Sequence, residues 1–196
     1  MKKFLTLALI IFVSLSSVAL AKKPVKIARL PIIVQQNQLD KETSTTLEMK
    51  FARAVKIPLN QTLKAAEYLP PRESSQALNQ IWQSMYAKDR NAKISDAIKI
   101  FADEMDADLV ICPILHHYSQ RTSPVHFSFE THLSSNVSAE LIVYDKRDKN
   151  LIDEKFSRHF DDHYNRFGTE SYLAGECFDK LIEKTELRKI IHSIKG

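Results

Sequence analysis

The sequence predicts an α/β (α+β) fold, in which helices pack on a single small mixed sheet. Residues 107–118 form its clearest strand, because apolar side chains occupy both faces, as in a central strand that is covered on two sides. Residues 137–160 predict a C-terminal antiparallel hairpin, since two alternating runs flank the polar segment 146–150. Helical stripes of apolar residues occur before the strand and after the hairpin.

The pattern of the central strand assigns its side chains to two faces. One face carries Leu109, Ile111 and Leu115, and the other carries Val110, Cys112 and Ile114. In the hairpin, pairing Val143 with Ile152 places Ala139 opposite Phe156 and Glu140 opposite Lys155. This register gives one apolar face and one face of paired charges, which suits a half-covered antiparallel sheet.

The remaining elements follow from local signals. Residues 25–34 alternate like a first strand, with Pro31 at an edge, bulge or strand end. Apolar stripes predict helices over 43–55, from Pro71 to Met85, over 94–105 and over 173–182, and a short segment 187–194 closes the chain. Residues 57–60 suggest a short strand, and a helical stripe follows up to Tyr68.

Residues 1–21 have the features of a secretory signal peptide. Lys2 and Lys3 precede an apolar run, and Ala19-Leu20-Ala21 offers small residues where a signal peptidase cuts. A retained anchor is the weaker alternative, because the run is short for a bilayer and serines interrupt it. We therefore expect an exported protein, periplasmic or extracellular, in which 22–196 form one soluble α/β domain without a membrane span. No cysteine follows the cleavage site to carry a lipid.

Composition excludes several classes of function. The formal net charge is +4, and losing Lys2 and Lys3 with the signal leaves +2, so no concentrated basic face for nucleic acid is expected. Only three glycines occur in the chain, which excludes glycine-rich phosphate loops and dinucleotide fingerprints. No serine stands in a nucleophile elbow and no carboxylate pair is singled out, so we expect a protein that is not an enzyme.

Cys112 and Cys177 are the only cysteines, in a compartment where disulfides can form. Both are predicted to face the interior, so they either bond to each other or remain buried free thiols.

Histidines suggest an alternative function. If residues 119–136 fold back as a β-flap, then His116, His117, His126 and His132 could approach one another and bind zinc or copper, as in a metal carrier or metal-dependent hydrolase. The opposing interpretation is that these histidines are solvent-facing, because no tight ligand spacing supports a metal. His159 and His163 could bind one metal ion only if they shared a face of a helix. Their segment follows a predicted strand, so we interpret it as the polar end of that strand.

The flap also suggests a contact surface. Val125, Phe127 and Phe129 alternate with polar residues and form an apolar ridge that either meets a partner or folds down onto the sheet. Together with the end of the central strand, this predicts a partner-binding surface of His116, His117, Tyr118, Val125, Phe127 and Phe129.

Three segments resemble a family of bacterial envelope domains. These are Lys26-Ile27-Ala28-Arg29-Leu30-Pro31, Ala107-Asp108-Leu109-Val110-Ile111 and Ala139-Glu140-Leu141-Ile142-Val143-Tyr144-Asp145. Their order is similar to the α/β domain shared by the TolB N-terminal region, CsgG and LpoB. The sequence departs from the family in having Asp106 where a glycine often stands and in lacking the lipid-anchoring cysteine. The resemblance implies a non-enzymatic binding or accessory module without cofactor, whose partner is an envelope protein or cell-wall component.

Overall fold

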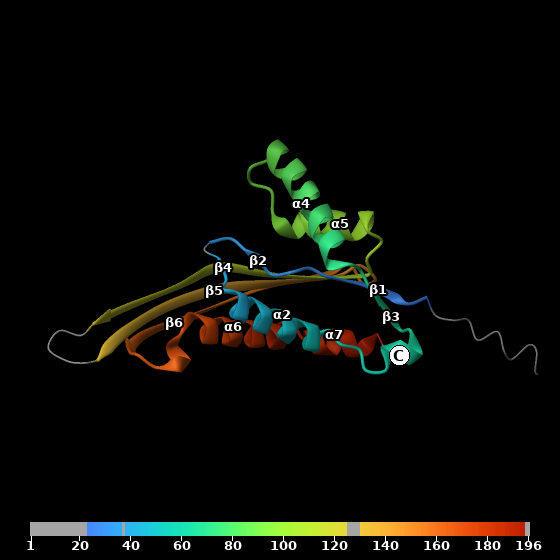
Figure 1. Ribbon diagram of the computed structural model, residues 1–196. Coiled ribbons are helices and arrows are strands. Elements are labelled where there is room, and N and C mark those ends of the chain that lie inside the picture. The colour runs from blue at the N-terminus through green and yellow to red at the C-terminus, as the bar shows by residue number, and fades with distance from the viewer. Residues whose placement is uncertain (1–22, 37, 125–129, 195–196) are drawn as a thin grey trace, which may run out of the picture.

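The computed structural model describes residues 23–36, 38–124 and 130–194, and the structural statements below concern these residues. The predicted signal peptide and the predicted contact residues Val125, Phe127 and Phe129 lie outside them, as does His126. A six-stranded mixed sheet has helices on both faces, which confirms the predicted fold class (Figure 1). Its elements run in this order: β1 Val25–Arg29, β2 Ile33–Val34, α2 Lys41–Ala54, α3 Asn60–Leu63, β3 Ala66–Tyr68, α4 Pro71–Lys88, α5 Ile94–Glu104, β4 Leu109–Pro124, β5 Thr131–Asp145, β6 Asn150–His163, η1 Arg166–Gly168, α6 Glu170–Lys184 and α7 Leu187–Ser193.

The strand order is β3-β1-β4-β5-β6, and β2 pairs with β4 beyond the end of β1. β1 runs parallel to β3 and β4, whereas β4, β5 and β6 are antiparallel. The hairpin register is the predicted one, with Val143 opposite Ile152 and Glu140 opposite Lys155. Both hairpin strands are longer than predicted, and β3 occupies residues for which a helical stripe was expected, so that prediction was wrong.

Two apolar cores lie on the two faces of the sheet. Leu109, Ile111 and Leu115 pack toward α2, α6 and α7, while Val110, Cys112 and Ile114 pack toward α4 and α5. This alternation is the predicted one, and every residue from Leu109 to Leu115 is buried. β4 is therefore the central strand of the sheet, as expected for a segment that is apolar on both faces.

A proline lies within this central strand. The carbonyls of Ile111 and Leu115 accept hydrogen bonds from Leu30 and Gln35, so the nitrogen of Pro113 faces the same side, between the ends of β1 and β2. Because no strand pairs there, the missing N–H costs no ladder hydrogen bond. Pro31 lies in the same break, as the predicted strand end.

The last three strands extend beyond the helices that cover one face. We call the projecting part the arm, and it comprises residues 116–124, 131–140 and 155–163 (Figure 1). The face toward α4 and α5 is the outer face of the arm, and the face toward η1 and α6 is its inner face. The flap expected over 119–136 is thus, in its described parts, a continuation of β4 and β5.

Candidate functional site at the base of the arm

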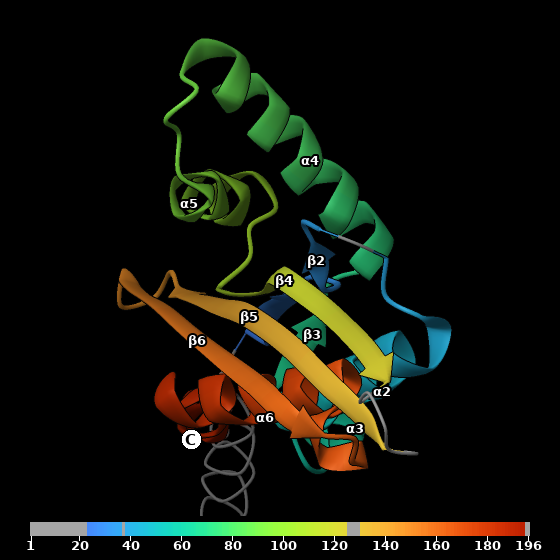
Figure 2. The ribbon, with the colours of Figure 1, turned by 90° about the vertical axis from the view of Figure 1, so that its left-hand side faces the viewer.

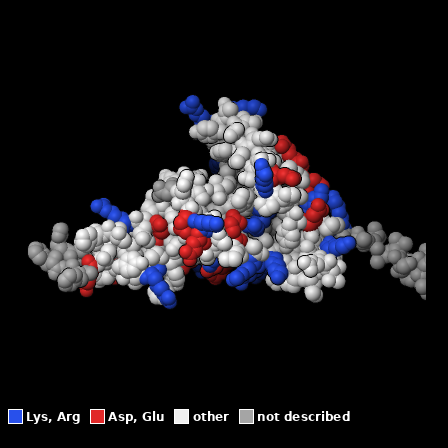
Figure 3. All heavy atoms as spheres, in the orientation of Figure 1, with Lys and Arg blue, Asp and Glu red and all other residues white. Residues whose placement is uncertain are grey.

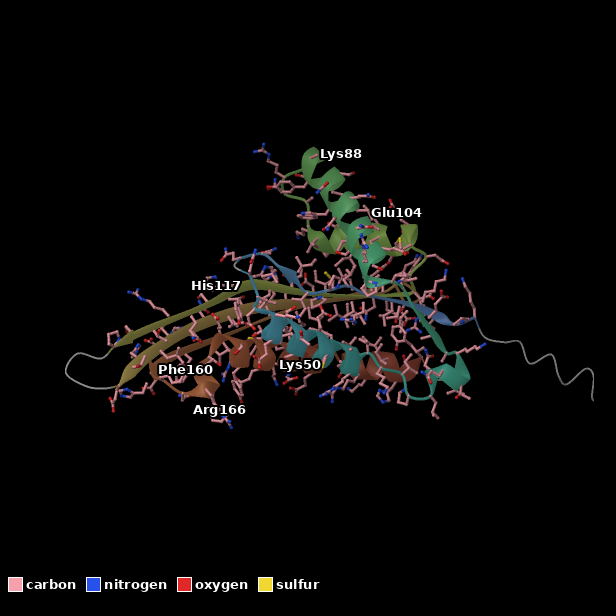
Figure 4. All side chains as sticks on the ribbon, in the orientation of Figure 1. Lys50, Lys88, Glu104, His117, Phe160 and Arg166 are labelled. Atoms are coloured by element: carbon pink, nitrogen blue, oxygen red, sulfur yellow. The ribbon has the colours of Figure 1, made fainter. Side chains whose placement is uncertain are left out.

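After a β-bulge in β4, ordinary strand alternation places the predicted contact residues His117 and Tyr118 on opposite faces. Leu115 pairs with Ala139 and His117 with Ser138, so His116 is the extra residue of β4. His117 then lies on the outer face, while Tyr118 is buried with Val137 on the inner face. Figure 4 shows His117 on the upper side of the sheet and Phe160 and Arg166 on the lower side. The predicted contact surface is therefore divided.

The bulge histidines bind to neighbours within the chain. His116 pairs through Nδ1 with Gln35 Oε1 at 2.7 Å and through Nε2 with the Glu140 carboxylate. His117 Nδ1 lies 2.9 Å from Gln36 Oε1, and the Ser119 hydroxyl lies 3.0 Å from its Nε2. These contacts hold the segment after β2 against β4.

His116, His117 and His132 do not converge on one point. His132 lies further along the arm, with Nε2 3.6 Å from Asp161 Oδ1. Among the residues that the structure describes, no group of three histidine, cysteine or acidic side chains could hold a metal ion. His159 and His163 belong to β6, a strand, as the sequence indicated.

Cys112 and Cys177 are free and buried, so the disulfide alternative was wrong. Cys112 packs in the core toward α4 and α5, whereas Cys177 of α6 packs in the opposite core, so the sheet separates the two sulfur atoms. Burial raises the pKa of the Cys112 thiol, and burial raises the pKa of the Cys177 thiol to about 12.

A charged cluster spans the outer face where the arm begins. The Glu140 side chain is only 4% exposed and pairs with His116 and with Lys155 Nζ at 3.3 Å. Burial alone would raise the pKa of Glu140, but hydrogen bonds from Asp153 and His116, together with the charge of Lys155, lower it. Burial and the adjacent Glu140 raise the pKa of Asp153 to about 6. The cluster ties β4, β5 and β6 together.

A cavity of about 550 Å³ lies between the first turns of α2 and α6, on the same side of the sheet as the inner face of the arm. Its lining combines polar, charged and aromatic side chains: Asp40, Glu42, Thr43, Thr46, Leu47, Arg166, Phe167, Thr169, Ser171 and Tyr172. Figure 1 shows α2 and α6 on this face, and η1 after the end of β6.

Two side chains cap the helices that border this cavity. Asp40 accepts the Thr43 N–H at 2.8 Å, and Thr169 accepts the Tyr172 N–H at 3.4 Å. Tyr118 joins the cavity wall to the arm, because its hydroxyl donates to Asp40 Oδ2 at 3.4 Å and lies 3.5 Å from Thr43 Oγ1. Burial raises the pKa of Tyr118 to about 12, so the phenol stays a donor.

Aromatic side chains remain exposed at the mouth of the cavity. Phe167 and Tyr172 meet edge to face with their ring centroids 5.2 Å apart, although they are 51% and 42% exposed. The Arg166 guanidinium lies 4.7 Å from the Phe167 ring centroid. Asn165 holds η1 by accepting the N–H groups of Phe167 and Gly168. This aromatic cluster of Arg166, Phe167 and Tyr172 was not predicted from the sequence.

Gly168 positions the aromatic cluster against the arm. A Cβ at this residue would lie 2.3 Å from the Phe160 ring, so the backbone of η1 rests directly on the inner face of β6. A sequence signal for the site did exist, since Tyr164, Arg166, Phe167 and Tyr172 crowd one polar segment around a glycine.

The comparisons with known proteins found similarity among solved structures only. No family model matches the chain, and no curated protein matches it either. Lipoprotein GNA1162 from Neisseria meningitidis is 14% identical, over 83% of this chain and 99% of that one, with a TM-score of 0.38. The hypothetical protein CT253 from Chlamydia trachomatis is 11% identical, over 86% and 99%, with a TM-score of 0.43. The LpoB C-terminal domain from Salmonella enterica is 10% identical, over 67% and 81%, with a TM-score of 0.31.

These similarities are low in identity and in TM-score, and we derive no function from them. LpoB, one of the predicted relatives, is among the similar structures, whereas the resemblance to TolB and CsgG stays a prediction. Within the described ranges, no helix is both long enough and apolar enough to cross a membrane.

Proposed function

We propose that this chain is an exported, non-enzymatic module of the bacterial cell envelope that binds another envelope protein at the base of its arm. The observation that carries the proposal is the aromatic cluster, whose Phe167 and Tyr172 stay exposed at the mouth of a cavity. Tyrosine, phenylalanine and arginine are enriched in protein interfaces, where they act as anchors. The signal-like residues 1–21 support the envelope location.

The polar groups around the cavity support binding rather than catalysis. The side-chain oxygens of Asp40 and Thr169 cap helices, and the Tyr118 hydroxyl hydrogen-bonds to Asp40. These groups hold the rim in place, and a rigid rim lowers the entropy that is lost when a partner binds. The predicted contact residues Val125, Phe127 and Phe129 lie outside the described residues, and their role remains a proposal.

Paired aromatic variants test the proposed function. The full chain with Phe167→Ala and Tyr172→Ala is compared with Tyr86→Ala, whose ring on α4 is 49% exposed and lies on the other side of the sheet. Partners are captured from envelope extracts, identified, purified and titrated against each variant. We expect the double variant to weaken binding by tenfold or more, as for interface anchors, and Tyr86→Ala to leave it unchanged.

Unfolding curves confirm that each variant is folded before it is titrated. Equal affinity of the double variant and the wild type would refute the proposed site. Binding to purified cell wall, with no protein captured, would replace the protein partner with a glycan.

A further inference from the structure

β6 is a long edge strand whose outward backbone groups have no partner strand. Tyr164 N–H donates to Thr131 C=O at 2.8 Å, and β5 and β6 pair without a register shift, so even-numbered residues of β6 bond to β5. The odd-numbered residues from Leu151 to Asp161 therefore direct N–H and C=O groups away from the sheet. Among the described residues, none accepts or donates to these backbone groups. Figure 2 shows β6 as the outermost strand beside β5.

We propose that β6 pairs antiparallel with β6 of a second copy of this chain, about a twofold axis through Phe156. This pairing would join the two sheets into one and satisfy the outward backbone groups of both edges. An axis that passes through a residue always pairs odd-numbered with odd-numbered residues, so their outward backbone groups can exchange hydrogen bonds, and Phe156 then forms a non-hydrogen-bonded pair with its copy.

The side chains of β6 complement themselves in this register. On the inner face, Glu154 of one copy would lie opposite Arg158 of the other, and Ile152 opposite Phe160. On the outer face, Asp153 would lie opposite His159. Opposite charges and apolar pairs directly across two strands are stabilising, and the twofold axis repeats each pair.

Neighbouring registers lack this complementarity. Moving the axis to Lys155 places two lysines opposite each other, and moving it to Ser157 places Asp153 opposite Asp161. Like charges directly across from each other destabilise a pair of strands. The charge pattern of β6 thus favours one register for self-pairing.

Ion pairs between β6 and α6 on the inner face extend the charge complementarity between the two copies. Lys184 Nζ of α6 lies 3.4 Å from Glu154 Oε2, and Arg158 Nη2 lies 3.2 Å from Glu176 Oε2. Across the axis, the glutamate and the arginine of β6 would complete an alternating row from Lys184 of one copy to Glu176 of the other. Since α6 packs under β5 and β6, the two α6 helices would lie two to three strand spacings apart, roughly 10–14 Å, without overlapping.

Charge-reversal variants of the full chain, purified after export, test the pairing by sedimentation equilibrium. Glu154→Arg alone sets arginine against arginine across the axis, and Arg158→Glu alone sets glutamate against glutamate. We expect each to weaken the dimer by about tenfold or more, and an equimolar mixture of the two to restore it as a heterodimer. Each variant also breaks an ion pair within its own chain, Glu154 with Lys184 or Arg158 with Glu176, and mixing the two variants would not restore those pairs.

A single cysteine tests the register. Phe156→Cys would face its own copy across a non-hydrogen-bonded pair, where the distance suits a disulfide, while His159→Cys would lie several residues from its copy and serve as control. We expect oxidation to cross-link the first variant and not the second. A wild-type chain that stays monomeric at high concentration would overturn the proposal and indicate that the charges of β6 protect the edge from pairing. Equal cross-linking of the two variants would overturn the proposed register.

Discussion

Gly168→Ala is expected to destabilise the protein through a single contact. The added Cβ would lie 2.3 Å from one ring carbon of Phe160 and 2.7 Å from the ring carbon nearest its backbone, so the whole ring must move. Ordinary carbon contacts are about 3.5–4.0 Å, which sets the shift above about 1 Å. Overpacking of this kind costs about 1–3 kcal/mol, and we expect the free energy of unfolding to fall by that amount.

Gly175→Ala is the matched control for this prediction. Gly175 lies within α6, and the only atom near its added Cβ is Lys50 Nζ at 3.9 Å. Alanine replaces glycine in a helix interior with a gain of about 0.5–1 kcal/mol, so the two glycine variants should change stability in opposite directions. Urea unfolding followed by circular dichroism measures both.

A double variant isolates the contact. In a Phe160→Val background the ring is absent, so Gly168→Ala should lower the free energy of unfolding by less than about 0.5 kcal/mol. The difference from its effect in the wild-type background measures the coupling between the two residues. The reasoning is wrong if Gly168→Ala is neutral in the wild-type background, or if it costs the same with and without the ring. Since η1 carries Phe167, the same variant should also weaken partner binding.

Further predictions concern the charged cluster around Glu140 and the two buried thiols. Glu140→Gln removes the negative charge that pairs with His116 and Lys155, and it should lower the free energy of unfolding at pH 7 by about 1–3 kcal/mol. Urea unfolding measures this change. The control Asp161→Asn, at an exposed residue, should change the free energy of unfolding by less than about 0.5 kcal/mol. The pKa of Asp153 is raised to about 6, so the folded state binds more protons than the unfolded state between about pH 4 and 6, and this carboxyl lowers stability as the pH rises through that window. Asp153→Asn should therefore be more stable than the wild type at pH 7, by less than about 1 kcal/mol because the group is partly exposed, and equal to it near pH 4 in a pH series of unfolding curves. Cys112 and Cys177 should react with a thiol reagent only as fast as the chain unfolds, and reactivity of the folded protein within seconds would contradict their burial.

The sequence predicted the structure best where the periodicity of apolar side chains within one strand or hairpin reflects which faces are buried. Leu109 to Leu115 alternates between two cores, and the register of Val143 with Ile152 follows from apolar and charged pairs within one hairpin. Both patterns need only neighbours in the chain or across a short turn. They could therefore be derived without knowing the rest of the fold.

Features that depend on distant partners were missed. β3 has three residues, and it is a strand because Ala66 pairs with Val25 far away in the chain. Residues 119–124 were expected only as part of a β-flap; they carry no apolar alternation, so the length of β4 comes from pairing with β5. The cavity also joins distant segments, since Asp40 and Thr169 cap helices that are adjacent only after folding. No local pattern encodes such contacts.

The arm also has a surface chemistry of its own. Its outer face is polar along its length, and Figure 3 shows acidic and basic side chains spread among uncharged ones along the arm. The side chains that alternation places there are His117, Ser119, Arg121, Ser123, His132, Ser134, Asn136, Ser138, Glu140, Lys155, Ser157, His159, Asp161 and His163, together with the bulge residue His116. The polar pattern keeps this exposed sheet hydrated.

The bulge at His116 determines which side chains of β4 lie on each face of the arm. Before it, odd-numbered positions of β4 face the inner core; after it, even-numbered positions do. Deleting this one residue would leave an unbroken ladder, because Leu115 already pairs with Ala139 and His117 with Ser138, so His117, Tyr118 and Ser119 would keep their faces. The bulge is thus the place where β4 can lose one residue without inverting its faces, whereas the same loss within the regular part of the arm, with the bulge kept, would turn every later side chain to the opposite face.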